Sequence, residues 1–288
     1  MKLKLRFTKM EGCGNDYILI DCVEGVLPAD PQRLSVLLSD RHRGIGADGL
    51  VLLCPSQTAD VCMRMFNADG SEGRVCGNAL RCVCKHIYNG KTVENFPLAI
   101  ETLAGIRRVK KLPDGRFSAE MGRAEFAPEK IPVLLGGEKI IGREAVLAGG
   151  KRRITCVSVG NPHCVLFTED AGHAPITSLG AEIEKDPLFP ERVNVEFVQV
   201  LDRHTLRMRV WERGSGETLA CGTGACAAAV AAVENGYCDE GTEITVLLPG
   251  GILQVRQREG NITLIGEARE VFSGEIYVEN DDPSGSPF

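Results

Sequence analysis

The sequence has 288 residues, of which 43% are hydrophobic and 25% are charged, and its formal net charge is −6 at pH 7. This composition is typical of a folded globular protein, so it excludes wholesale disorder, and the length predicts about two domains. The acidic balance argues against nucleic acid or an anionic membrane as a partner, and the aromatic content of 5% argues against a base-stacking platform.

The N-terminal segment alternates charged with apolar residues, which predicts a β-strand and not a signal peptide. The longest apolar stretch, 220–233, is too short to span a membrane. We therefore expect a cytoplasmic protein, in a reducing compartment where its twelve cysteines form no disulfide framework. No C-x-x-C motif occurs, so no metal site is predicted, and most of the thiols are expected in the core.

The elements predicted along the first half form a helix–strand–strand–helix series. They are a helix that begins at Asp30-Pro31, strands at 50–54 and 62–66, and a helix at about 78–88 that stops at Asn89-Gly90. The same series is predicted in the second half, with a helix from Pro175 to Ile183, strands at 195–200 and 206–211, and a helix at about 223–234 that stops at Asn235-Gly236. Each half closes with strands around a turn, at 112–115 and at 258–260.

Individual residues also repeat at an offset close to 145. The pairs are Cys76-Gly77 with Cys221-Gly222, Asn15 with Asn161, Pro31 with Pro175, Gly49 with Asn194, Asn67 with Glu212, Gly105 with Gly250, and Gly115 with Gly260. Glycines mark turns in any fold and can coincide, but a nearly constant offset across Asn, Pro and Cys-Gly favours a duplicated fold. The predicted fold class is α+β: two pseudo-symmetric halves, each a sheet wrapped around a long central helix, with the active site in the cleft between them.

We assign residues 1–125 to the N-terminal half, completed by a C-terminal strand near 270–279, and residues 126–269 to the C-terminal half. The Pro- and Gly-rich stretch 128–150 is expected to connect the halves. The tail 280–288, rich in Pro, Ser and Asp, is predicted to be flexible.

Cys76 and Cys221 each stand immediately before one of the two central helices. A helix N-terminus carries about half a positive charge and free N–H donors, so we expect lowered thiol pKa values and a bound carboxylate there. A pseudo-twofold axis would place the thiols on opposite sides of the cleft. That arrangement suits inversion of a carbon centre, because one thiolate removes the α-proton and the other thiol protonates the opposite face. Either cysteine alone would more often be an inert core residue, but the duplicated context reverses that preference.

Further polar residues suit an amino-acid ligand with a second charged end. Glu212 offers an acceptor for an ammonium group and Arg213 a forked donor for a carboxylate. Four asparagines lie in loop or strand-end settings: Asn15, Asn67, Asn161 and Asn194. The asparagines could instead serve turns, and Arg213 a surface ion pair. No dinucleotide fingerprint or P-loop follows a strand, so no cofactor is predicted.

Five strings closely resemble the diaminopimelate epimerase family, and the resemblance extends over about residues 9–278. They are GCGNDY (12–17), FNADGSEGRVCGNALRC (66–82), GNPHCV (160–165), PERVNVEF (190–197) and WERGSGETLACGTGACAAA (211–229). The resemblance implies a cofactor-independent epimerase that interconverts LL- and meso-2,6-diaminopimelate for lysine and peptidoglycan synthesis. It further implies a homodimer and domain closure over the substrate.

The resemblance also assigns roles. It makes Cys76 and Cys221 the catalytic pair, with His163 and Glu212 adjusting the two thiols. It implies that the reacting carboxylate is held at Gly77-Asn78 and Gly222-Thr223, and that the substrate is lined by Asn15, Asn67, Asn161, Asn194, Glu212 and Arg213. Three positions depart from the family pattern: Glu11 stands where His is common, Cys13 where Leu is frequent, and Gly49 where some members have a substrate-contacting Gln.

Two alternatives remain open. A related racemase for proline or hydroxyproline would share the thiol pair, but a compact imino acid would not need Arg213 and four asparagines. A thiol-rich metal or redox-sensing protein is supported only by the cysteine count. The partner expected under the leading hypothesis is a small diamino diacid.

Overall fold

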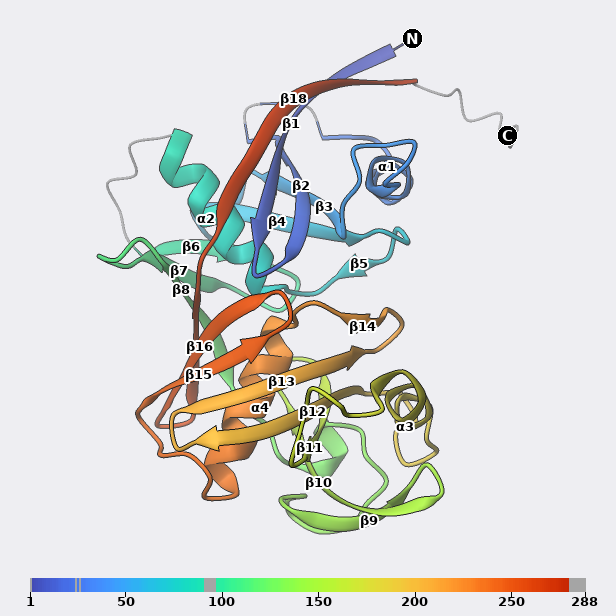
Figure 1. The fold of residues 1–288 in the computed structure, drawn as a ribbon. Coiled ribbons are helices and arrows are strands. Elements are labelled where there is room, and N and C mark those ends of the chain that lie inside the picture. The colour runs from blue at the N-terminus through green and yellow to red at the C-terminus, as the bar shows by residue number, and fades with distance from the viewer. Residues whose placement is uncertain (1, 24, 26, 91–96, 280–288) are drawn as a thin grey trace.

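The computed structural model describes residues 2–23, 25, 27–90 and 97–279. It shows two lobes, each built around one central helix, α2 (Gly77–Gly90) in one lobe and α4 (Gly222–Glu234) in the other (Figure 1). In Figure 1 these two helices meet end to end across the boundary between the lobes. Each lobe is built mainly from one half of the chain, which places residues from both halves at the boundary.

Apart from one additional strand at the start of the second half, the two halves contain corresponding elements in the same order. The first half contains β1 (Lys2–Gly12), β2 (Asn15–Asp21), α1 (Pro31–Ser39), β3 (Gly49–Cys54), β4 (Val61–Asn67), β5 (Glu72–Gly73), α2, β6 (Leu98–Glu101), β7 (Arg107–Lys111) and β8 (Phe117–Arg123). The second half contains β9 (Arg143–Leu147), β10 (Gly150–Ser158), β11 (Pro162–Phe167), α3 (Ala181–Glu184), β12 (Asn194–Asp202), β13 (Thr205–Glu212), β14 (Gly216–Thr218), α4, β15 (Glu243–Leu248), β16 (Gly251–Arg258) and β17 (Asn261–Gly266), and β18 (Arg269–Glu279) follows.

Strand pairing repeats with the elements. In the first half β2 is parallel to β3, β3 antiparallel to β4, and β4 parallel to β6. In the second half β11, β12, β13 and β15 pair in the same sequence of directions. The predicted α+β fold of two equivalent halves is therefore confirmed.

Two antiparallel ladders tie the ends of the repeats together. Strand β8 pairs with β17, its counterpart in the other half. Strand β18 pairs with β1 along nearly its whole length, from Lys2 opposite Glu279 to Glu11 opposite Arg269. The boundary at 125/126 stays a prediction, and the tail 280–288 lies outside the described residues.

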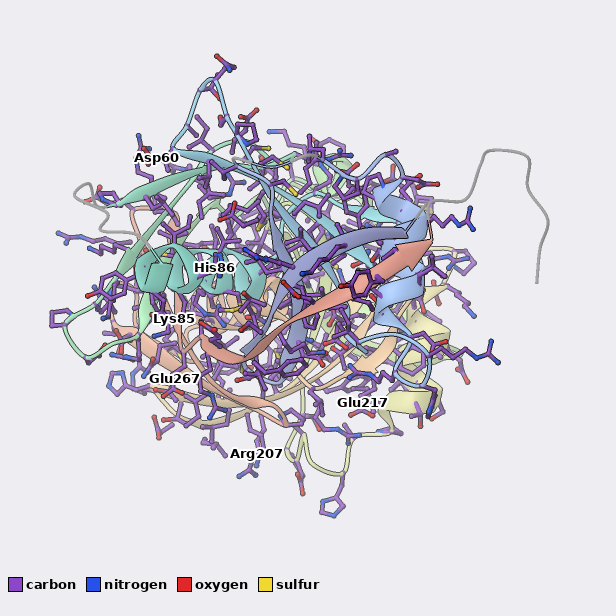
Figure 2. The ribbon with its side chains drawn as sticks, turned by 90° about the horizontal axis from the view of Figure 1, so that it is seen from above. Asp60, Lys85, His86, Arg207, Glu217 and Glu267 are labelled. Atoms are coloured by element: carbon purple, nitrogen blue, oxygen red, sulfur yellow. The ribbon has the colours of Figure 1, made fainter. Side chains whose placement is uncertain are left out.

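The sheets wrap closely because α4 is built of small residues. Its residues from Gly222 to Ala232 are all buried, and eight of these eleven are Gly or Ala, the others being Thr223, Cys226 and Val230. The sheet therefore approaches the helix backbone on every side. One continuous apolar core surrounds both central helices. Ten of the twelve cysteines are buried, which confirms the core interpretation for most of them. Exposed charged side chains such as Asp60 and Arg207 lie at the rim of the molecule (Figure 2).

Two segments differ from the prediction. The expected helix from Pro175 to Ile183 begins as a π-helical turn, Ile176–Gly180, and only Ala181–Glu184 is α-helical. The stretch 128–150 is more than a connection, because it contains β9, which pairs with β10. In β9 Ala145 and Leu147 are buried while Glu144 and Val146 are exposed, the period-two pattern of a half-buried strand. In the part of the chain that the structure describes, no helix is both long and apolar enough to cross a membrane.

Candidate active site

A cleft of about 1350 Å³ lies between the lobes and is lined by residues from both halves. Twelve of the residues singled out in the sequence line it: Asn15, Asn67, Cys76, Gly77, Asn78, Asn161, Asn194, Glu212, Arg213, Cys221, Gly222 and Thr223. His163 does not line the cleft and is fully buried behind it. The duplication therefore brings both thiols and both helix N-termini to one cavity.

The glycine after each cysteine lets the two helix N-termini approach each other. A β-carbon placed on Gly222 would lie 3.7 Å from the Cα of Gly77. The same atom would lie 3.0 Å from Leu264, and a β-carbon on Gly77 would lie only 2.6 Å from that leucine. Because Leu264 is fully buried and cannot move freely, larger residues would force the helix ends apart.

The turns of two hairpins close one end of the interface between the lobes. The turn between β1 and β2 places Gly14 against Gly250, in the turn between β15 and β16. A β-carbon on Gly250 would lie 2.3 Å from the backbone oxygen of Cys13, closer than any real contact. Gly14 also has a φ of +83°, a conformation that glycine adopts without strain. Both glycines are therefore required by the packing of one half against the other.

Both thiols lie at the N-terminal ends of their helices, as predicted. The Cys221 Sγ accepts a hydrogen bond from the backbone N–H of Gly224 at 3.3 Å and lies 3.4 Å from the Thr223 hydroxyl. The backbone oxygen of Cys76 accepts the first helical hydrogen bond, from the N–H of Leu80 at 3.0 Å. The Cys76 Sγ lies 3.1 Å from the hydroxyl of Tyr17. Each sulfur is thus held by hydrogen-bond donors on its own side of the cleft.

The expected lowering of the thiol pKa values is wrong. Burial raises the pKa of Cys76, and this outweighs the opposing hydrogen bonds from Tyr17 and from backbone N–H groups. Burial, together with the nearby Glu212 carboxylate, raises the pKa of Cys221 well above its usual value. The helix N-terminus favours thiolate, but removing the sulfur from water costs more than the terminus returns.

Glu212 is placed to act on both thiols electrostatically. Its carboxylate accepts a hydrogen bond from the Thr218 hydroxyl. Burial raises the pKa of Glu212, and hydrogen bonds from Thr218 and Cys221 act in the opposite direction. In turn the negative charge of Glu212 acts to raise the pKa of both Cys76 and Cys221. Proton transfer at either thiol is therefore coupled to this carboxylate.

His163 is engaged on both ring nitrogens. Nδ1 lies 2.6 Å from Glu196 Oε1 and Nε2 lies 2.9 Å from Asn161 Oδ1. Among the hydrogen bonds of the described residues, none joins His163 to either thiol. The ring therefore orients Asn161, which lines the cleft. Its other partner, Glu196, lies against the N-terminus of α4, because a β-carbon on Gly224 would be 3.0 Å from the Glu196 Oε1 atom.

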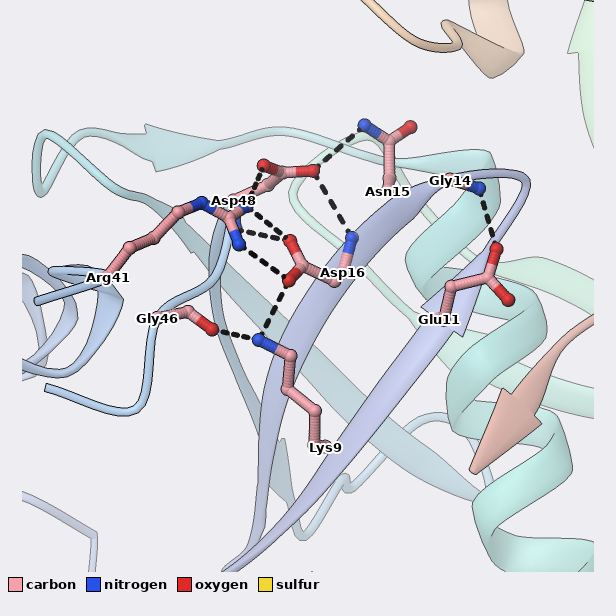
Figure 3. Close-up of polar contacts among 8 residues, drawn as sticks. All are labelled: Lys9, Glu11, Gly14, Asn15, Asp16, Arg41, Gly46 and Asp48. Carbon is pink, nitrogen blue, oxygen red and sulfur yellow. Dashed lines mark hydrogen bonds and ion pairs between the residues drawn. The ribbon is translucent and has the colours of Figure 1, made fainter. Parts of the chain in front are cut away.

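A charged network around Asp16 and Asp48 fixes Asn15 (Figure 3). Asn15 donates to Asp48 at 3.0 Å and accepts from Asn78 at 2.6 Å. Asp48 is also bound by Arg41, which makes a two-point contact with Asp16 at 2.8 and 3.0 Å. The opposite wall is fixed similarly, since the Asn194 side chain accepts from the Arg213 backbone N–H at 2.9 Å.

The network continues behind the cleft through a buried lysine. The Lys9 ammonium is 7% exposed and lies 2.8 Å from Asp16, which is 19% exposed. Burial acts to raise the pKa of Asp16, but hydrogen bonds from Arg41 and Lys9 outweigh it and leave that pKa lowered. Asp16 is therefore the anion that compensates a nearly buried cation.

Replacement of Asp16 by asparagine is expected to reduce the free energy of unfolding by about 2 kcal/mol, because Lys9 loses its charge partner in a site that retains some solvent. Because the pKa of Asp16 is lower in the folded protein than in the unfolded chain, its ionisation stabilises the fold at pH values above the unfolded pKa of ~3.9. This contribution is lost as the pH falls through the pKa of the folded state. The free energy of unfolding of both proteins is measured by urea unfolding at a series of pH values from 7 to 3. The control is Asp239→Asn, which removes an exposed pair with Arg203 and should cost under ~1 kcal/mol. Equal effects of the two substitutions at pH 7 would contradict this assignment.

Sequence reasoning missed four residues of the site: Tyr17, Asp48, Glu196 and Thr218. Tyr17 and Glu196 sit within strings that carried the resemblance, and Glu196 is a lone charge in the apolar run 195–198. A charge in such a run is a signal for a buried polar role. Asp48 carried no comparable signal. Among the described residues no group of three or more His, Cys, Asp or Glu is placed to hold a metal ion.

The fold of this chain is that of solved racemase and epimerase structures. Solved structures with this fold include a probable proline racemase from Agrobacterium radiobacter, with a TM-score of 0.72, 16% identity, and coverage of 97% of this chain and 94% of that one. A hydroxyproline epimerase from Agrobacterium vitis has a TM-score of 0.68 at 16% identity, covering 97% and 93%. At these identities the likeness shows the fold alone.

The chain belongs to the diaminopimelate epimerase family. The sequence pattern of that family matches residues 7–127 and 155–271. A diaminopimelate epimerase from Pelotomaculum thermopropionicum is 49% identical over 277 residues, covering 94% of this chain and 98% of the relative. One from Acetivibrio thermocellus is 47% identical over 279 residues, with the same coverage. The family resemblance expected from the five strings is confirmed.

Proposed function

We propose that this protein is a cofactor-independent diaminopimelate epimerase that interconverts the LL and meso isomers of 2,6-diaminopimelate in lysine and peptidoglycan precursor synthesis. The observation that carries the proposal is that Cys76 and Cys221, at the N-termini of two facing helices, line one cleft. Family membership supports the substrate, since relatives at 49% and 47% identity carry this name.

In the proposed reaction one thiolate removes the α-proton. The new S–H bond forms as the C–H bond breaks, and the electron pair passes into the substrate carboxylate. The second thiol then delivers its proton to the opposite face of the carbon and becomes the thiolate, so the roles exchange with direction. The backbone N–H groups of Gly77-Asn78 and Gly222-Thr223 are proposed to hold the carboxylate, where one well-placed donor contributes about 3–4 kcal/mol.

The raised thiol pKa values suggest a role for the positive charge of the substrate in forming the thiolate. Burial disfavours both thiolates, so a cation bound beside either sulfur would favour the ionised form of that thiol. The α-ammonium of the substrate is such a cation, and it would lower the thiol pKa on binding. Glu212 is proposed to bind ammonium and to adjust the thiols, and His163 to act through Asn161. The distal end is proposed to lie against Asn67, Asn194 and Arg213.

We also propose that the enzyme is cytoplasmic and acts as a homodimer. Strand β18 supports an association between copies because three of its large apolar side chains are exposed. These are Val271, Phe272 and Tyr277, at 57%, 47% and 61% exposure. An edge with this much exposed apolar surface suits burial against a second copy.

The function is tested by incubating the reduced, metal-free and pyridoxal-free protein with LL-diaminopimelate in D2O. Meso product with one α-deuterium, followed by chiral chromatography and mass spectrometry, is the expected result. Turnover of proline in place of diaminopimelate would identify the related racemase instead. Absence of exchange with both compounds would overturn the proposal and return attention to thiol binding.

A further inference from the structure

Tyr17 stands out because its hydroxyl has a thiol as its partner. The side chain lies on β2, is 2% exposed, and packs within the core that surrounds the central helices. Its Oη lies 3.1 Å from the Sγ of Cys76. In the part of the chain that the structure describes, the Tyr17 hydroxyl makes its hydrogen bond with this sulfur. Phenylalanine would fill the same apolar space, so packing alone does not account for the oxygen.

The repeat shows that this contact belongs to one half. Tyr17 and His163 occupy equivalent places, because each follows a cleft asparagine by two residues and lies opposite the first residue of a parallel strand, Gly49 or Asn194. His163 is bound to Glu196 and Asn161, whereas Tyr17 reaches the thiol. The two halves share a backbone, but they give their thiols different chemical partners.

The chemistry of a thiolate decides the direction of this hydrogen bond. A thiolate has no hydrogen, so the tyrosine must donate whenever Cys76 acts as a base. Hydrogen bonds to an ionised acceptor are about twice as strong as those between neutral groups. Burial, together with the adjacent Cys76, raises the pKa of Tyr17 well above its usual value, so its own proton stays on oxygen.

We propose that Tyr17 is a positioning residue for Cys76. The Tyr17 hydroxyl donates a hydrogen bond to the Cys76 thiolate, favours the ionised form of that thiol and holds the sulfur toward the cleft. The proposal rests on the two-thiol function proposed above. It gives the two thiols different support. Cys221 has the Gly224 N–H at 3.3 Å and the Thr223 hydroxyl at 3.4 Å, and Glu196 disfavours its ionisation in addition to Glu212, which acts on both thiols.

The test is the Tyr17→Phe variant, which removes one oxygen and keeps the ring. Iodoacetamide alkylation of Cys76 is measured against pH by mass spectrometry of its peptide, in the absence of substrate. Loss of the donor should move the midpoint for Cys76 up by about one pH unit, so that the thiolate is about tenfold scarcer at a given pH below it. The midpoint for Cys221 should not move. Tyr237→Phe, at a ring that packs on Phe167 in the other lobe, is the matched control.

Turnover provides a second readout. In Tyr17→Phe, kcat should fall about tenfold with KM unchanged, and the acidic limb of the pH profile should move to higher pH in the direction in which Cys76 is the base. An unmoved Cys76 alkylation midpoint in the folded variant would overturn the proposal, as would equal shifts at both thiols. Should the variant not fold, 3-fluorotyrosine at position 17, a stronger donor of the same shape, should lower the Cys76 midpoint. Since alkylation needs no substrate, a protein inactive on diaminopimelate would refute the proposed function without obscuring this result.

Discussion

Replacement of either Cys76 or Cys221 by alanine should reduce epimerisation by about 10³- to 10⁴-fold, the largest effect expected for any substitution in this chain. Inversion requires proton transfer on both faces of the α-carbon, and each face is proposed to be served by one sulfur. The remaining donors of the helix N-termini would still bind the carboxylate, so substrate binding should survive while turnover is lost. The loss should be equally large for both variants.

A one-sided reaction should persist in each variant. The remaining thiol can still remove the proton from the isomer that faces it and return a deuteron to the same side. Mass spectrometry in D2O should therefore detect slow exchange in one stereoisomer without inversion, and the two variants should prefer opposite isomers. The matched controls are Cys82→Ala on α2 and Cys226→Ala on α4, buried cysteines of the same helices that do not line the cleft. Near-normal turnover in Cys76→Ala or Cys221→Ala would contradict the two-base assignment.

Substitution of Arg213 by methionine should raise the KM for diaminopimelate about 100-fold, with a smaller change in kcat. Arg213 lines the cleft, and its position is fixed by its backbone N–H on Asn194 and by Nη1 on the backbone oxygen of Glu191 at 3.0 Å. A guanidinium held in this way presents a planar donor to a carboxylate. Loss of a charged hydrogen-bonded contact of about 3 kcal/mol corresponds to this change in affinity.

A truncated substrate separates binding from structural damage. Lysine has the second ammonium group but lacks the distal carboxylate, so the wild-type protein and Arg213→Met should bind it equally weakly. Arg207→Met, which changes an exposed arginine on β13, the strand that precedes Arg213, is the control and should leave KM unchanged. A similar loss of affinity for lysine and diaminopimelate in Arg213→Met would show that the residue does not read the distal carboxylate.

Local signals sufficed for the duplication and for the two thiols. A Cys-Gly step at the start and an Asn-Gly stop at the end mark each central helix within about fifteen residues, and the helices begin at Gly77 and Gly222. The short strand at 143–147 was overlooked since the Pro and Gly residues around it hid a period-two pattern.

The ionisation of the site depends instead on residues far apart in the chain. The helix N-termini favour thiolate, as their sequence predicts, but the burial of both sulfurs in the folded protein outweighs that effect. Tyr17 reaches Cys76 across 59 positions, and Gly250 meets the backbone of Cys13 from the other lobe. Helix caps and turns are set by neighbours within a few residues, so sequence alone determines them. Desolvation and hydrogen-bond partners depend on which distant segments pack together, and that is settled when the two halves close on each other.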